Sequence, residues 1–146
     1  MKRVYAIEKL CLNCKVCEVY CKTAHSKSKD IIKAYKYEKP EPVARITVEG
    51  DNNISFAAQC RHCQDPLCVQ SCITGAMYKD PITGKVLNNE EKCIGCMTCL
   101  AACPYGVIKV GDVALKCDLC QDEDMPVCVK NCPNHALIYI EGGSEQ

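Results

Sequence analysis

The sixteen cysteines of this 146-residue chain fall into four groups of four, and this pattern constrains the fold more than any other feature. Each group opens with a CxxC pair and closes with a CxxxC step. In chain order the quartets are Cys11, Cys14, Cys17 and Cys21; Cys60, Cys63, Cys68 and Cys72; Cys93, Cys96, Cys99 and Cys103; and Cys117, Cys120, Cys128 and Cys132. A cubane [4Fe-4S] cluster takes four cysteine thiolates, so the count equals the requirement of four clusters with no thiol left over.

The third quartet, CIGCMTCLAACP at 93–104, is the bacterial ferredoxin run without deviation. In that run three thiolates hold one cluster, while the fourth ligates another cluster, so clusters come in pairs. The other quartets depart in loop length or in the final proline. Lys22 and Ile73 follow the first and second quartets, whereas Pro133 follows the fourth. None of these departures removes a ligand.

Structural zinc is the main alternative for CxxC pairs, and a zinc-structured adaptor or interaction module is the alternative function. Four quartets that each close through a CxxxC step favour iron–sulfur clusters over zinc. Disulfides suit a secreted chain better than a cytosolic one. One reactive dithiol would not need sixteen cysteines.

The apolar material left for a conventional core is thin, since the chain has one Phe and no Trp. Small chains of this kind need metals or disulfides to fold, so we expect the apo-protein to be largely unfolded. Each quartet predicts a ligand loop and a short helix with the CxxxC step. Strands are expected at the N-terminus before Cys11, after the last three quartets, and at 112–116. Hairpins are predicted for 44–58 and across the Asp80–Gly84 turn.

The stretch 22–59 separates the first two quartets, and its first half is basic. Residues 1–50 carry 11 Lys and Arg against 6 Asp and Glu, which leaves 7 against 12 in residues 51–146. Four anionic clusters would make the holo-protein acidic, so the basic N-terminal third would stand out as its electropositive part. The stretch is either a solvated insertion or a docking surface for an acidic partner, with Lys27, Lys29, Lys33 and Lys36 as the candidate contacts. Nucleic-acid binding is not expected of so short a patch.

Residues other than cysteine give no sign of catalysis. No phosphate-binding glycine loop, nucleophile elbow or nicotinamide fingerprint occurs. His62 lies inside the second quartet, where packing or a hydrogen bond to a cluster is expected in preference to ligation. His25 and His135 are expected at the surface or behind the ligands. An electron carrier that works with the active site of another protein is therefore predicted.

No signal peptide is visible after Met1, and no apolar run approaches the 18 residues or more of a membrane span. We therefore predict a cytoplasmic protein without a direct membrane span.

Three motifs carry a family resemblance: CxHCxxPxCxxxC at 60–72, CIGCxxCxxACPYG at 93–106, and KCDLC followed by PxCVxxCP at 116–133. With them the chain resembles the four-cluster electron-transfer subunits of the dimethyl sulfoxide reductase type. The short length and the first quartet, which runs on to His25 and Ser26, are most similar to the small ferredoxin-like partner of anaerobic carbon monoxide dehydrogenase.

The resemblance implies an α+β fold of two fused bacterial-ferredoxin-like halves with interlocked cluster-binding loops. One half would comprise 1–21 with 112–146, the other 60–111, and 22–59 would be an insertion with a hairpin. It also implies crossed ligation, in which the four clusters take Cys11, Cys14, Cys17 and Cys132; Cys117, Cys120, Cys128 and Cys21; Cys60, Cys63, Cys68 and Cys103; and Cys93, Cys96, Cys99 and Cys72. Named by the quartet that gives three ligands, the clusters would form a chain in the order first, fourth, third, second.

The resemblance implies single-electron transfer through four [4Fe-4S] clusters. The partners would be a redox acceptor protein and a catalytic oxidoreductase subunit, such as carbon monoxide dehydrogenase, formate dehydrogenase, hydrogenase or aldehyde oxidoreductase.

Overall fold

In the computed structural model, which describes residues 1–51 and 53–141, short elements of both kinds alternate along the chain. The strands are β1 (Lys2–Ala6), β2 (Ile46–Gly50), β3 (Ser55–Gln59), β4 (Met77–Lys79), β5 (Val86–Asn88) and β6 (Leu137–Glu141). The helices are η1 (Glu8–Leu10), α1 (Val16–Ala24), α2 (Ile31–Lys36), α3 (Leu67–Gln70), α4 (Thr98–Ala102) and α5 (Val127–Lys130). The α+β class predicted from the sequence is confirmed.

The described strands pair as three antiparallel two-stranded sheets. β1 pairs with β6, so the two ends of the described chain meet, and the Met1 amino group lies 2.8 Å from a Glu141 carboxylate oxygen. The hairpins β2–β3 and β4–β5 form where the sequence predicts them. The first of these begins at Ile46 instead of residue 44, and its predicted turn includes Asn52, which lies outside the described residues.

Two of the predicted strands do not form. The run after Cys103 and the segment 112–116 meet only through an isolated antiparallel bridge between Lys109 and Leu115. Gly111 explains the tightness of this connection, because a Cβ there would lie 3.0 Å from the Leu115 side chain. The pairing does not extend outward to Val107 and Cys117, and the Cys117 carbonyl accepts from the Lys116 ammonium at 2.9 Å.

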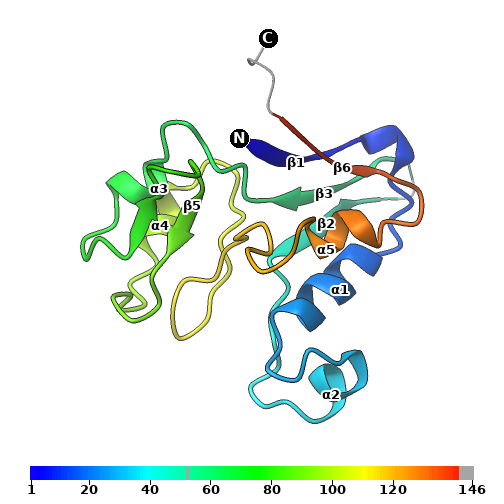
Figure 1. Cartoon of the computed structure of the whole chain (residues 1–146), viewed down its shortest axis with the longest axis horizontal. Helices are drawn as coiled ribbons and strands as arrows, with labels where there is room; N and C mark the ends of the chain where they lie inside the picture. The colour runs from blue at the N-terminus through cyan, green and yellow to red at the C-terminus, as the bar shows by residue number, and fades with distance from the viewer. Residues whose placement is uncertain (52, 142–146) are drawn as a thin grey trace.

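The buried apolar residues form two separate clusters. The first joins Val4 and Leu137 of the terminal sheet to Ile46, Val48 and Ala57 of the β2–β3 hairpin. The second gathers Met77, Cys99, Ile108 and Ala114. Figure 1 shows the same division, with α3, α4 and β5 on one side and the terminal strands, α1 and α5 on the other. The hairpin within 22–59 is thus part of a core, whereas α2 projects from the body of the molecule (Figure 1).

Within 1–51 and 53–141, every helix falls short of the length and hydrophobicity that a bilayer crossing requires.

Candidate iron–sulfur cluster sites

Each quartet adopts the predicted combination of a ligand loop and a short helix. The third cysteine is the second residue of α1, α3, α4 or α5, and the closing cysteine lies in its helix or within two residues after the helix ends. A left-handed residue precedes the second cysteine in every loop: Asn13, His62, Gly95 and Leu119, with φ of 54°, 46°, 71° and 61°. The four loops therefore turn in the same way despite their different lengths.

A second repeated turn follows the closing cysteine in the last three quartets. Gly75, Gly106 and His135 have positive φ, and each donates its backbone N–H to the carbonyl of the cysteine three residues before it, at 3.2–3.3 Å. The first quartet departs from this pattern because α1 continues beyond Cys21 to Ala24. The residues that follow these three quartets indicate a turn before the next segment, and the structure forms a turn at each place, with glycine at two of the three positions.

Two cavities each bring together three cysteines of one quartet and the closing cysteine of another. The first cavity is lined by Cys11, Cys14 and Cys17 together with Cys132. The second is lined by Cys60, Cys63 and Cys68 together with Cys103. Cysteines more than 100 residues apart in the sequence thus face one cavity in the first case.

The remaining cysteines also gather across quartets, because Cys21 lies in one apolar cluster with Cys117 and Cys128, and Cys72 lies in the other with Cys93 and Cys99. The charge of Cys21 contributes, after burial, to raising the pKa of Cys117, Cys120 and Cys128. Burial is likewise the main cause that raises the pKa of Cys99, and the charge of Cys72 raises it further.

The thiols suit metal ligation better than they suit free cysteine chemistry. All sixteen are free of disulfides. Burial raises the pKa of Cys17 to about 12 and those of Cys68 and Cys120 to about 11. A bare thiolate at these positions would be costly, whereas a bound metal ion stabilises it.

Backbone N–H groups point at several of the cysteine sulfurs. Arg45 and Ala136 donate to Cys21 and Cys132 at 3.2 Å, and Met77 donates to Cys72 at 3.4 Å. These three acceptors are closing cysteines of their quartets. Hydrogen bonds of this kind orient thiolate ligands and tune the potential of a cluster. The residues present therefore fit iron–sulfur clusters, which would supply the one-electron chemistry when bound.

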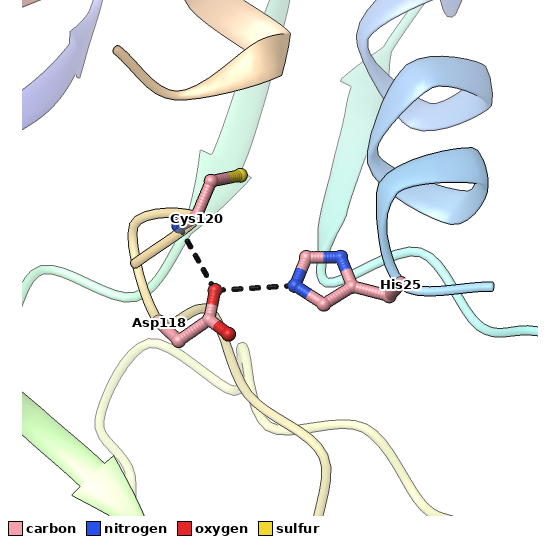
Figure 2. Close-up of side chains that lie close together, drawn as sticks. All are labelled: His25, Asp118 and Cys120. Atoms are coloured by element: carbon pink, nitrogen blue, oxygen red, sulfur yellow. Dashed lines mark hydrogen bonds and ion pairs between the residues drawn. The ribbon is translucent and has the colours of Figure 1, made fainter. Parts of the chain in front are cut away.

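His25, Asp118 and Cys120 form a close group beside the fourth quartet (Figure 2). The His25 Nε2 lies 3.1 Å from one Asp118 oxygen, and the Arg45 guanidinium donates to the other at 3.0 Å. Burial would lower the pKa of His25, but hydrogen bonds with Asp118 and Cys21 outweigh it and raise the pKa to about 9. Burial opposes ionisation of Asp118, yet His25 and Arg45 hold the pKa of this carboxyl below its usual range.

Cys120 joins this group through its backbone, because its N–H donates to Asp118 at 3.0 Å while Figure 2 shows its thiol directed away from the carboxylate. The group braces the ligand loop, because Asp118 ties the Cys120 backbone to His25. His25 is therefore placed behind the ligands, one of the two locations expected for it.

The other histidines differ from each other. His135 is exposed. His62 is fully buried, and its Nδ1 accepts the Val86 N–H at 3.0 Å. Burial and the charge of Lys116 lower the pKa of His62 to about 3, so the ring is neutral. The His62 ring packs between the second quartet and β5, and packing is one of the two roles expected for it.

The repeated loops, the crossed cavities and the sulfur-directed N–H groups define an iron–sulfur protein of the ferredoxin type. A family model described as "4Fe-4S dicluster domain" matches residues 52–141, and the chain belongs to this family. It contains multiple [4Fe-4S] clusters and is an electron-transfer protein. The family assignment also favours iron over the structural zinc that the spacings left open.

Several curated proteins are similar over most of the chain. "Electron transport protein HydN" of Escherichia coli K12 is 38% identical, over 90% of this chain and 83% of the relative. "Iron-sulfur protein" of Rhodospirillum rubrum is 35% identical, over 94% and 81%. "Protein NrfC" of Escherichia coli K12 is 33% identical, over 90% and 61%.

Among solved structures, the "Active site complex BamBC of Benzoyl Coenzyme A reductase as isolated" matches with a TM-score of 0.51 and 24% identity. The match covers 96% of this chain and 76% of that chain. At this identity it supports the fold alone.

Proposed function

We propose that the chain carries single electrons through four [4Fe-4S] clusters with crossed ligands. The ligand sets are Cys11, Cys14, Cys17 and Cys132; Cys117, Cys120, Cys128 and Cys21; Cys60, Cys63, Cys68 and Cys103; and Cys93, Cys96, Cys99 and Cys72. The observation that carries the proposal is the pair of cavities, each lined by three cysteines of one quartet and the closing cysteine of another.

We further propose that the molecule consists of two ferredoxin-like halves, one of residues 1–21 with 112–146 and one of 60–111. The two buried clusters support this division, because one gathers cysteines of the first and fourth quartets and the other those of the second and third. The hairpin of the segment 22–59 belongs with the first half, since Ile46 and Val48 pack in its core. Residues 142–146 of the first half lie outside the described residues.

The clusters are proposed to lie in the order first, fourth, second, third. This order differs from the one that the family resemblance implies. Lys116 lies in the wall of the second-quartet cavity and directly precedes Cys117. After burial, the charge of Cys60 is the leading electrostatic cause that raises the pKa of Cys117. The fourth cluster therefore has the second as its neighbour across the boundary between the halves.

The proposed partners are a catalytic oxidoreductase and a redox acceptor protein. Relatives named as electron transport proteins support the role of a carrier without catalysis of its own. The finer assignment, to a subunit of the dimethyl sulfoxide reductase type or to a partner of carbon monoxide dehydrogenase, rests on the motif resemblance alone.

Contact through the basic segment around α2 is a separate proposal. Lys27, Lys29, Lys33 and Lys36 are all exposed. Lys36 lies 5.3 Å from the ring centroid of Tyr37, which is 66% exposed, so charge and aromatic surface occur together. Changing Lys27, Lys29 and Lys33 together to Glu should weaken partner binding, and the loss should grow smaller at high salt. Unchanged affinity would leave the segment as a solvated insertion.

Metal analysis of the anaerobically purified protein tests the four-cluster proposal. Sixteen irons and sixteen sulfides per chain are expected, with EPR signals from reduced [4Fe-4S] clusters. Eight irons would reduce the proposal to two clusters, and zinc in place of iron would overturn it.

A further inference from the structure

Lys116 is a buried cation between two proposed cluster sites. Its side chain is only 3% exposed, and within the described residues it forms no ion pair with a carboxylate. An unpaired charge in the interior costs several kcal/mol unless other groups compensate it. A structure that retains such a lysine therefore needs a nearby source of negative charge.

The protein itself supplies only part of the compensation. The Lys116 ammonium donates to the carbonyl of Val86 and, at 2.9 Å, to the carbonyl of Cys117. Carbonyl dipoles satisfy its protons but carry no net charge.

The position of Lys116 suggests where the negative charge comes from. The lysine lies in the wall of the cavity that Cys60, Cys68 and Cys103 line. It also directly precedes Cys117, a proposed ligand of the neighbouring cluster. An oxidised [4Fe-4S] cluster with four thiolates carries about two negative charges, and reduction adds a third.

We propose that Lys116 raises the reduction potentials of both the second-quartet cluster and the fourth-quartet cluster. The electron would then preferentially occupy these two clusters, which lie on either side of the boundary between the two halves. The inference rests on the proposed four-cluster function. A fixed cation stabilises the reduced form of each flanking cluster more than the oxidised form, because the reduced form carries the additional negative charge. In the proposed order each of these two clusters has a cluster on either side, so without Lys116 each would be exposed to the negative charge of two neighbours.

The chain offers a matched control. Lys92 directly precedes Cys93, as Lys116 precedes Cys117, but Lys92 is exposed. Water screens its charge, so the substitution Lys92→Gln should change each reduction equilibrium less than twofold. In Lys116→Gln the side-chain amide can still donate to a carbonyl while the charge is lost. Lys116→Arg keeps the charge.

The test is an anaerobic EPR-monitored redox titration of the holoproteins, after their iron content has been measured. In Lys116→Gln, two of the four midpoint potentials should become more negative, each by about a tenfold change in the reduction equilibrium, or about 59 mV. Lys116→Arg should retain the wild-type potentials. If Lys116→Gln fails to assemble its clusters while Lys116→Arg assembles them with wild-type potentials, the requirement for charge is likewise supported.

Unchanged potentials in Lys116→Gln would overturn the inference, and so would failure of both variants to assemble, because that would assign Lys116 a purely steric or hydrogen-bonding role. These outcomes are distinct from a failure of the proposed function, which the iron content of the wild-type protein reveals by itself.

Discussion

The substitution Asp118→Asn should loosen the fourth ligand loop and accelerate loss of its cluster. Asp118 links three segments, because it binds His25 at the end of α1, Arg45 before β2, and the Cys120 N–H in its own loop. The asparagine can keep the bond from Cys120 but removes the negative charge from the other two contacts. The change therefore isolates the ion pairs from the loop geometry.

The expected loss can be estimated from these contacts. A hydrogen bond to a charged group contributes about 1.5–3 kcal/mol to stability. The Asp118 side chain is 24% exposed, so solvent screens part of both interactions. We therefore take a total of about 2 kcal/mol, which is a factor of about 30 in an equilibrium constant. If half of this loss of stability appears as a lower activation free energy of unfolding, the cluster should be lost roughly fivefold faster.

The assay is the anaerobic decay of cluster absorbance in guanidinium, compared with that of Asp122→Asn. Asp122 is exposed in the same loop and forms no ion pair within the described residues, so its variant should decay at the wild-type rate. Combining Asp118→Asn with Arg45→Gln should give less than the sum of the two single effects, since they share one interaction. Equal decay rates for Asp118→Asn and wild type, or strict additivity with Arg45→Gln, would refute the reasoning.

Three further predictions concern the ligand loops. Cys132→Ala should disrupt the cluster held by the first quartet, and EPR that showed loss of the fourth-quartet cluster alone would contradict crossed ligation. Gly95→Ala should destabilise the holoprotein by about 2 kcal/mol or more in chemical denaturation, because φ is +71° and the new Cβ would lie 2.5 Å from the Asp112 carbonyl oxygen. Gly75→Ala, with φ of +67° and open space, should cost only about 1 kcal/mol, and equal losses would exclude the clash as the cause. Removal of iron by chelation should abolish most of the far-UV circular dichroism, whereas a native-like apo spectrum would show that the apolar clusters suffice for folding.

The cysteine spacing predicted much of the fold, because each CxxxC step requires a helix to carry the closing thiol. The helices α3, α4 and α5 and the hairpin β4–β5 follow directly from local sequence. The spacing could not predict that 107–116 forms only a single bridge. This segment makes tertiary contacts instead, because the Ala114 N–H donates to Cys93 Sγ at 3.5 Å and the Ala114 carbonyl accepts from the Asn88 side chain at 2.7 Å.

The surroundings of the ligands were less predictable than the ligands themselves. The residues Arg45, Asp118 and Lys116 meet their partners across 30 to 93 positions of sequence. No local sequence pattern indicates such contacts. Lys116 stands next to a cysteine just as Lys92 does, and only the fold buries one and exposes the other.

Mössbauer spectroscopy of the ⁵⁷Fe-loaded protein, combined with quantitative iron analysis, measures both the number and the ligation of the clusters. Sixteen irons per chain are expected, all in cysteine-ligated [4Fe-4S] clusters, with a loss of about four in Cys132→Ala. Eight irons in the wild-type protein, or iron in sites other than [4Fe-4S], would contradict the four-cluster proposal.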